Sequence, residues 1–303
     1  MIVIGFNWLP HHDNSVAVVW DGKLVFASEE ERYTRHKHSV GEPPLNALKE
    51  AFKFLIRRGV KPKEVDAYAI NWDPRLYTKS RKPITKKELE FYLKKLIASE
   101  AVAVREYLLY DLAFPSHTSY VISAKKFVRK VIADLGEEVP PEIKIYSVRH
   151  HLAHAASAYY FSGFSSAAAI SIDGAGEFEA TVVWKVKDGE FEPLLSMYTS
   201  YGSLGTLWEA ITDRIKLGRL EGPGKAMGLA PYGKASAYYE RLKRFVRVDP
   251  DGDLPFYIAD GKVVRSIYHL QAVSIYENIA QKVIGAPRLE WNPRGELSQD
   301  AAD

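Results

Sequence analysis

Three of the chain's nine histidines fall within five residues, at His150, His151 and His154. A strand-like alternation precedes them at 143–148, and a helix-like run follows at 155–161. On a helix, His150 and His154 project from one face, about 5–6 Å apart at Cβ. Two neutral imidazoles at that spacing can hold one divalent metal. The competing interpretation is a helix cap beside ordinary surface histidines, and for an isolated pair that interpretation would be preferred.

The other histidines strengthen the case for a site. Clustered titratable side chains at strand–loop junctions indicate function. Seven of the nine histidines lie in three clusters, and His117 and His269 are interpreted as structural. The clusters are His11 and His12, His36 and His38, and His150, His151 and His154.

Two glycine-containing segments are candidates for binding phosphate through backbone N–H groups. Asp173-Gly174-Ala175-Gly176 follows an apolar strand, and Asp173 can bind a metal or accept a hydrogen bond; a plain glycine turn is the alternative. Gly222-Pro223-Gly224-Lys225 belongs to a predicted loop at 221–233, in which Gly224 and Lys225 could grip phosphate. Neither segment matches the Walker-A or the dinucleotide-binding pattern.

The elements that must position these residues form a repeated pattern. Three predicted strands are joined by a polar turn and the hairpin turn Asp21-Gly22, and three later strands are joined partly by Asp188-Gly189. This recurrence predicts two copies of one α/β unit. In that arrangement the His12–Asp13 turn and the Asp173 turn would face each other across a cleft. The predicted strands are 2–7, 15–20, 23–28, 65–72, 167–172, 179–186 and 191–197.

Helical patterns fill the rest of the chain. We expect a first subdomain at 1–165, with a helical insertion at about 75–137, and a second at 166–303 that is incomplete at its C-terminus. An acidic turn is predicted at 249–253, and 297–303 resemble the opening of a helix. The predicted helices cover 45–56, 88–97, 124–132, 204–217 and 269–283.

Composition limits the classes of function. The 303 residues are 47% hydrophobic and 26% charged, which is typical of a soluble globular protein. A net charge of +3 gives no indication of a nucleic-acid partner. There is no cysteine, so a metal must be held by His, Asp, Glu or water. The sequence shows neither a signal peptide nor a membrane span, and we expect a cytoplasmic protein.

Five stretches together resemble the N-terminal portion of the carbamoyltransferase family of antibiotic and nodulation-factor biosynthesis. They occur in the family's order over about residues 1–235. The lobe is also similar to the universal tRNA threonylcarbamoyl-transfer protein, which shares the HxxxH metal motif. The five stretches are 11–15, 27–38, 150–158, 173–177 and 225–233.

The resemblance implies a fold and a chemistry. The fold is the actin-like ATPase fold, built from two RNase-H-like copies. Carbamoyl phosphate and ATP give a carbamoyl-adenylate, and the carbamoyl group moves to a hydroxyl of a small-molecule acceptor. The family holds the adenylate beside a divalent metal, usually iron, although His and Asp ligands also suit zinc or manganese.

The resemblance also implies residue roles. His150, His154 and Asp173 map to the metal ligands. His12 maps to the histidine of the family's HD motif, as a general base or a carbamoyl contact. Lys37 matches a loop lysine that could neutralise carbonyl or phosphate oxygens.

The chain departs from the family in length, because family members are much longer. We therefore expect an N-terminal fragment, or one subunit of a split enzyme completed by a separate C-terminal chain. The family's Asp-Ser-Ala is Asp13-Asn14-Ser15 in this chain. The alternatives are a tRNA-modification lobe acting with partners, which predicts a basic surface, and a non-catalytic actin-like remnant.

Overall fold

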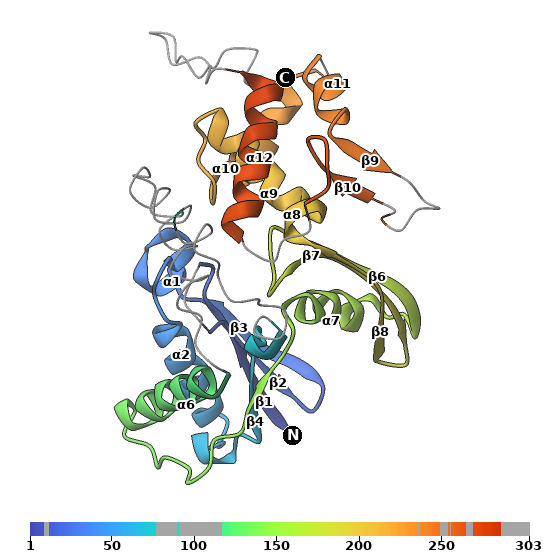
Figure 1. Ribbon diagram of the computed structural model, residues 1–303. Helices are drawn as coiled ribbons and strands as arrows, with labels where there is room; N and C mark the ends of the chain where they lie inside the picture. The colour runs from blue at the N-terminus through green and yellow to red at the C-terminus, as the bar shows by residue number, and fades with distance from the viewer. Residues whose placement is uncertain are drawn as a thin grey trace. The chain divides into compact units, whose positions relative to one another are not determined.

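A computed structural model describes residues 1–8, 12–76, 90, 117–234, 237–248, 254, 256–264 and 269–285. The chain divides into two compact units, Met1–Lys79 with Pro115–Ala153 and Ser80–Phe114 with His154–Asp303 (Figure 1). Both units combine helices with sheet, so the mixed α/β class is confirmed. None of the helices in the described ranges is long and apolar enough to cross a membrane.

The first unit contains a five-stranded sheet in the order β3-β2-β1-β4-β5. The first three strands form an antiparallel meander, while β4 pairs with β1 in parallel and β5 pairs with β4 in parallel. Asp21 and Gly22 both have positive φ, 47° and 77°, which suits a two-residue hairpin turn. The strands are β1 (Ile2–Phe6), β2 (Ser15–Trp20), β3 (Lys23–Glu29), β4 (Ala67–Ile70) and β5 (Ile145–Ser147).

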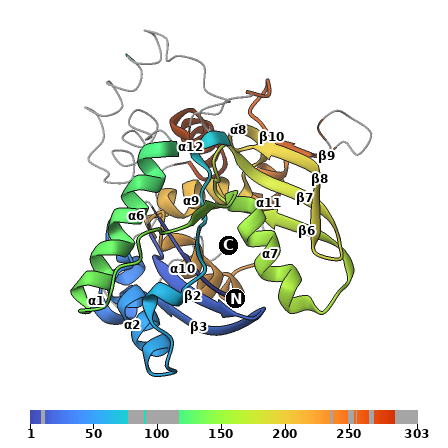
Figure 2. The same ribbon diagram turned by 90° about the horizontal axis from the view of Figure 1, so that it is seen from below.

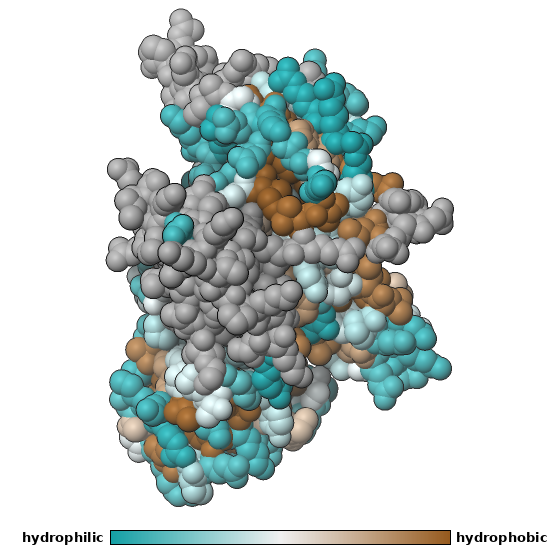
Figure 3. Space-filling view, in the orientation of Figure 1, coloured by the Kyte–Doolittle hydropathy of each residue, from teal (hydrophilic) through white to brown (hydrophobic). Residues whose placement is uncertain are grey.

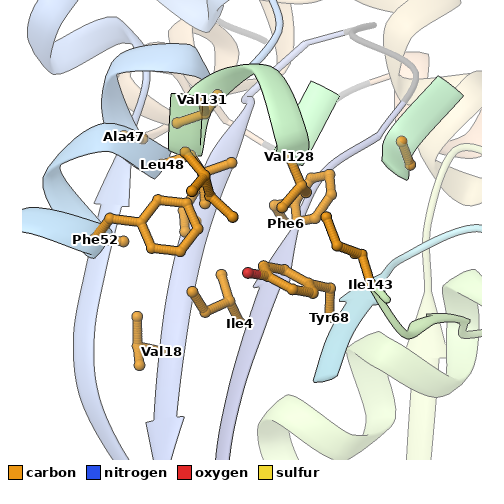
Figure 4. Packing of buried hydrophobic residues seen from close by; sticks show 14 of the residues in the cluster. Ile4, Phe6, Val18, Ala47, Leu48, Phe52, Tyr68, Val128, Val131 and Ile143 are labelled. Atoms are coloured by element: carbon orange, nitrogen blue, oxygen red, sulfur yellow. The ribbon is translucent and has the colours of Figure 1, made fainter. Parts of the chain in front are cut away.

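Two helices cover one face of this sheet, α2 (Leu45–Ile56) and α6 (His117–Asp134) (Figure 1). Alternate residues of β1 are buried beneath them, as the period of a half-buried strand requires. Figure 4 shows the resulting packing of the labelled side chains between sheet and helices. The shorter helical pieces of this unit are α1 (Glu31–Thr34), η1 (Lys37–Ser39) and η2 (Pro62–Glu64).

A second antiparallel meander, in the order β6-β7-β8, lies in the second unit. Its hairpin turn again uses an Asp-Gly pair, Asp188 and Gly189, with φ of 50° and 84°. Helix α7 (His150–Ser162) packs on this sheet through Tyr159, whose ring centroid is 5.4 Å from that of Phe191 (Figure 2). The strands are β6 (Ser166–Ile172), β7 (Glu179–Lys187) and β8 (Glu190–Tyr198).

The other face of this meander leaves apolar side chains in contact with solvent. Ile170 and Ile172 are 60% and 57% exposed, on alternate positions of β6. Figure 3 shows brown, hydrophobic atoms over this part of the molecule, at the right of the view. The β6 edge has a single neighbour, β7, among the strands that the structure describes.

Helices dominate the remainder of the second unit, where α12 packs along α9 around buried Tyr276. The predicted loop at 221–233 is wrong, because these residues form α10 and η3. Pro223 is tolerated in the first turn of a helix, and most of the following residues favour helix. The elements are α8 (Thr199–Gly202), α9 (Leu204–Arg214), α10 (Gly222–Leu229), η3 (Ala230–Tyr232), α11 (Ala237–Lys243), β9 (Val246–Val248), β10 (Phe256–Ile258) and α12 (His269–Ile284).

Most other predicted elements are present within a few residues of their predicted bounds. Several predictions fall on residues that the structure does not describe. They are His11, residues 77–116 of the helical insertion (which include the helix at 88–97) apart from residue 90, the acidic turn at 249–253 and the segment 297–303. The predicted subdomain boundary at 165/166 remains a prediction, and the division between the two compact units falls inside α7, after Ala153.

Glu30 fixes the acidic loop that follows β3. It is 1% exposed, and its carboxylate accepts hydrogen bonds from the backbone N–H groups of Asn46 at 3.1 Å and Ala47 at 2.8 Å. The side-chain amide of Asn46 donates to it at 2.6 Å. These backbone groups form the first turn of α2, where unpaired N–H groups and the helix dipole favour an anion. A loop carboxylate therefore caps a helix that begins 15 residues later.

We expect Glu30→Gln to lower the free energy of unfolding by about 2 kcal/mol, because an amide cannot accept all three hydrogen bonds and carries no charge. Glu29→Gln is the matched control, since the Glu29 side chain is 46% exposed and pairs with Arg32 alone among the described residues. Its expected effect is under about 0.5 kcal/mol. Chemical denaturation of both variants measures the difference, and equal losses would remove the capping role.

Candidate functional site

Helix α7 carries the histidine pair that the sequence singled out. His150 is its first residue and His154 lies one turn later, so both imidazoles leave the same side of the helix. The His150 ring packs against Trp72, with ring centroids 5.3 Å apart. His151, between them in sequence, points elsewhere and is fully buried. The two histidines that the spacing argument selected therefore share one side of the helix, whereas His151 is buried.

Asp173 completes a group of three possible ligands. One ligand atom from each of His150, His154 and Asp173 lies within 4.8 Å of the others. Within this group, His154 Nε2 lies 3.3 Å from Asp173 Oδ2. The His154 and Asp173 side chains are 51% and 35% exposed, so solvent and ligands can reach them. The structure thus brings together the three residues predicted as metal ligands.

The Asp173 carboxylate is oriented by its own turn. Its backbone N–H donates to Ala180 O at 2.8 Å, which extends the β6–β7 ladder by one residue. Its Oδ1 accepts from the N–H of Gly174 at 2.7 Å. With Oδ1 fixed in this way, Oδ2 is the oxygen that lies toward His154.

The start of α9 holds the same turn in place. Ser203, the N-cap of α9, accepts from the N–H of Thr206 at 2.9 Å and donates to Gly174 O at 2.6 Å. The Thr206 hydroxyl also donates to Gly174 O, at 3.0 Å. A Cβ on Gly205 would lie 2.7 Å from Asp173 C and Gly174 Cα, and would also meet Gly174 N. Only glycine allows this close approach of helix and turn.

The electrostatics of the pair favour a proton or a cation. The hydrogen bond to Asp173 raises the pKa of His154 above its usual value, against the opposing effect of burial. Two imidazoles and one carboxylate are a donor set that suits iron(II), zinc or manganese. A divalent cation would replace the proton that Asp173 stabilises on His154.

His12 and Lys37 lie in two loops of the first unit that are hydrogen-bonded to each other. The backbone N–H of Asp13 donates to His38 O at 2.6 Å, and the Asn14 side chain donates to Ser39 O at 2.9 Å. His12 is half exposed. Lys37 is exposed and forms no ion pair with the described part of the chain. The two predicted catalytic side chains are therefore on adjoining loops.

Sequence reasoning missed the residues that organise these loops. It named this segment only for the cluster of His36 and His38, for Lys37 and for the family resemblance of 27–38. The structure gives separate partners to Glu30, Glu31 and His38. The carboxylate of Asp13 bridges His12 and His38. The signals in the sequence were the clustering of His36 and His38 and the family resemblance of residues 11–15 and 27–38.

Three of the four predicted phosphate-binding residues, Gly174, Gly176 and Lys225, have protein partners. The N–H of Gly176 donates to Glu179 O at 2.6 Å, and that of Gly174 donates to Asp173. Lys225 lies in α10 beside Glu221, with its Nζ 2.6 Å from Oε2, and Gly224 precedes it in the same helix. A phosphate at either position would compete with these contacts, and the role of the four residues stays a prediction.

We expect Gly205→Ala to weaken binding of a divalent metal about tenfold or more, because the added methyl group must displace the turn that carries Asp173. Gly228→Ala is the matched control, since a Cβ there meets nothing within 4 Å. Alanine also favours helix, so this control should be neutral or slightly stabilising. Calorimetric titration with iron(II) or zinc tests both variants. Unchanged metal affinity in Gly205→Ala would show that the contact between α9 and the Asp173 turn does not affect metal binding.

Metal binding should weaken as the pH falls, because a ligating imidazole must lose its proton. In the metal-free chain, the pair with Asp173 contributes stability below the pKa of an unfolded imidazole and loses it as pH rises through the raised pKa of His154. Below that raised pKa we expect the apparent metal affinity to drop about tenfold per pH unit. Titrations between pH 6 and 8.5 measure this slope, and a flat profile would exclude His154 as a ligand.

Two proteins similar to this chain are a cyanobacterial and a rhizobial protein. The chain is 33% identical over 247 residues to the uncharacterized protein sll1178 of Synechocystis. This alignment covers 80% of this chain and 36% of that protein. It is 29% identical over 248 residues to the nodulation protein NolNO of Sinorhizobium fredii, covering 82% of this chain and 32% of that protein. The chain thus spans about a third of the length of these curated relatives.

Solved structures resemble the chain only loosely. YeaZ from Pseudomonas aeruginosa is 15% identical, covers 66% of this chain and 70% of its own, and has a TM-score of 0.30. A Ppx/GppA family member from Aquifex aeolicus is 12% identical, covers 93% and 91%, and has a TM-score of 0.29. These scores are too low to assign a fold.

A family model covers most of the chain and agrees with the stretches at His12, Lys37 and the α7 histidines. The model described as the carbamoyltransferase N-terminus matches residues 3–258. This match spans both the loops of the first unit and the Asp173 turn of the second. The chain belongs to the carbamoyltransferase N-terminus family.

Proposed function

We propose that this chain is the carbamoyl-transferring part of an O-carbamoyltransferase with an actin-like fold. The observation that carries the proposal is the convergence of His150, His154 and Asp173 within 4.8 Å. Family membership supplies the reaction class, and the two Asp-Gly meanders are what a duplicated actin-like architecture would contain.

The substrates follow from the proposed reaction. Carbamoyl phosphate and ATP provide a carbamoyl-adenylate, in which the carbamoyl group is bonded to the phosphate of AMP. A hydroxyl of a small-molecule acceptor attacks the carbamoyl carbon, and AMP leaves. Because the chain spans about a third of its relatives, we propose that a further C-terminal segment or chain contributes the step that forms the adenylate.

His150, His154 and Asp173 would hold the divalent metal, for which iron is our first choice and zinc or manganese the alternatives. Bound there, the metal supplies a Lewis acid that polarises the carbamoyl carbonyl. The Asp173 turn is well suited to this task because its carboxylate is oriented by Gly174 and by the start of α9. Pre-oriented ligands raise affinity and fix the direction of the remaining coordination positions.

His12 and Lys37 would act on the organic groups. His12 is half exposed and can accept the proton that the acceptor hydroxyl loses on attack. Lys37 has an ammonium group on an exposed loop and can offset negative charge on phosphate oxygens. Gly174, Gly176, Gly224 and Lys225 remain proposed contacts to the phosphate or nucleotide. The proposal requires these groups to reach the substrate that the metal polarises.

The test supplies the adenylate directly. With carbamoyl-adenylate prepared enzymatically and a panel of polyols, we expect the iron-loaded chain to release AMP and form a carbamoyl ester. The His150→Ala/His154→Ala variant should lose bound metal and slow AMP release by about 10²-fold or more. His36→Ala is the control, because His36 pairs with Glu42 and takes no part in the proposed metal group. AMP release at the uncatalysed rate with metal-loaded wild type would refute the proposal.

A further inference from the structure

Asp13 joins two histidines that come from different loops. Its Oδ2 lies 2.8 Å from Nδ1 of His12, and its Oδ1 lies 2.8 Å from Nδ1 of His38. His12 is the neighbouring residue, whereas His38 belongs to η1, 25 residues later. The Asp13 carboxylate is therefore hydrogen-bonded to the Nδ1 nitrogen of each of the two imidazoles.

The protonation of Asp13 decides the direction of these hydrogen bonds. The hydrogen bond from His12, followed by that from His38, lowers the pKa of Asp13 to about 2. The carboxylate is thus ionised at neutral pH and can only accept. Both imidazoles must therefore donate through Nδ1–H, and in a neutral ring the lone pair is then on Nε2.

His38 differs from His12 in burial. The Nε2 atom of His38 is buried and has no hydrogen-bond partner among the residues that the structure describes. The His38 side chain is 19% exposed, against 51% for His12. A buried N–H without a partner, on a charged ring, would cost more than a buried lone pair. His38 therefore suits a structural role, and His12, which is more exposed, is the ring that can exchange protons with a substrate.

Backbone hydrogen bonds keep Asp13 in this position. Asp13, His38 and Ser39 all have positive φ, 51°, 62° and 42°, which these loops maintain through mutual contacts. The N–H of His38 donates to Glu31 Oε2 at 2.7 Å, and that of Asn14 donates to Ser39 Oγ at 3.1 Å. These loop contacts hold the Asp13 carboxylate, so its position does not depend on the orientation of His12.

We propose that Asp13 is a positioning residue that holds His12 in the Nδ1–H tautomer, with Nε2 as the atom that takes the proton of the acceptor hydroxyl. The inference deepens the proposed function and rests on it for the role of His12. In the step, the O–H bond of the acceptor breaks as the Nε2–H bond forms. The acceptor oxygen bonds to the carbamoyl carbon, and the bond from that carbon to the phosphate oxygen of AMP breaks.

A metal ion is a weaker explanation of the same cluster. Asp13, Glu31 and His38 each place a possible ligand atom within 4.8 Å of the others. Both oxygens of Asp13 and one of Glu31 already accept hydrogen bonds from His12 and His38. The other charged groups nearby are Arg32, which is 3.6 Å from Glu31, and Lys37. Hydrogen bonding accounts for the geometry without a cation.

The test uses the full chain labelled with ¹⁵N at histidine, with the His12 signals assigned from a His12→Gln variant. Ring ¹⁵N shifts distinguish a protonated from an unprotonated nitrogen. In the wild type above neutral pH we expect Nδ1–H on His12, and finding Nε2–H would overturn the proposal without any variant. In Asp13→Asn we expect the population of the Nε2–H tautomer of His12 to increase, because the acceptor that favours Nδ1–H is lost.

Two further variants separate orientation from loop structure. Glu42→Gln removes a carboxylate from His36, which it contacts at 3.1 Å, and should leave His12 unchanged. His38→Gln removes the second partner of Asp13 but not the bond to His12, so the His12 tautomer should persist. Loss of the Nδ1–H tautomer of His12 in His38→Gln would overturn the proposal. In that case the contact with His38, and not the Asp13 carboxylate alone, would orient His12.

Kinetics and metal content complete the experiment. If transfer occurs, Asp13→Asn should lower kcat by about 10²-fold with little change in KM, and an unchanged kcat would overturn the positioning role. If the tautomer behaves as expected but no transfer occurs, the proposed function fails and the geometry of Asp13 stands. A divalent ion that stays bound in His150→Ala/His154→Ala and is lost in Asp13→Asn would identify a metal site and overturn the inference.

Discussion

The candidate metal centre depends on the close contact between the start of α9 and the turn after β6. The contact requires glycine at position 205, and it is reinforced by the hydroxyls of Ser203 and Thr206, which both donate to Gly174 O. It places the Asp173 carboxylate at the end of a strand, where the N–H of the following residue fixes one oxygen. A carboxylate on an unsupported loop would lose much more conformational entropy on binding a metal.

The parts of the site that rest on local periodicity were predictable from the sequence. The spacing of His150 and His154 is a property of any α-helix, and Asp21-Gly22 and Asp188-Gly189 form their hairpin turns because both positions need positive φ. Asp173 could be connected to the histidines only through the family resemblance. The proximity is tertiary, set by the packing of α7 on the β6-β7-β8 meander and of α9 against the turn after β6, and no spacing in the sequence encodes it.

Prediction from the sequence was wrong or incomplete where a residue type is compatible with two different local structures. Gly222, Pro223 and Gly224 suggested a loop, but proline in a first helical turn is compatible with the helix that forms. Nothing in the sequence distinguishes Glu30 from the neighbouring charged residues, although it is buried and caps the first turn of α2, which lacks a side-chain cap of its own. The partners of Glu30 are distant in sequence, and the helix at Gly222 depends on backbone geometry. Composition alone therefore gives the wrong prediction in both cases.

The two aspartates that contact histidines differ in a way that assigns them different tasks. Asp173 has one oxygen fixed by a backbone N–H and the other directed at an imidazole Nε2, the usual metal-binding nitrogen. Asp13 has both oxygens occupied by imidazole Nδ1 groups, which leaves each Nε2 on the far side of its ring. A cation at Asp13 would have to break two charge-assisted hydrogen bonds, whereas at Asp173 it replaces one. Asp173 is therefore suited to bind metal, and Asp13 to orient a base.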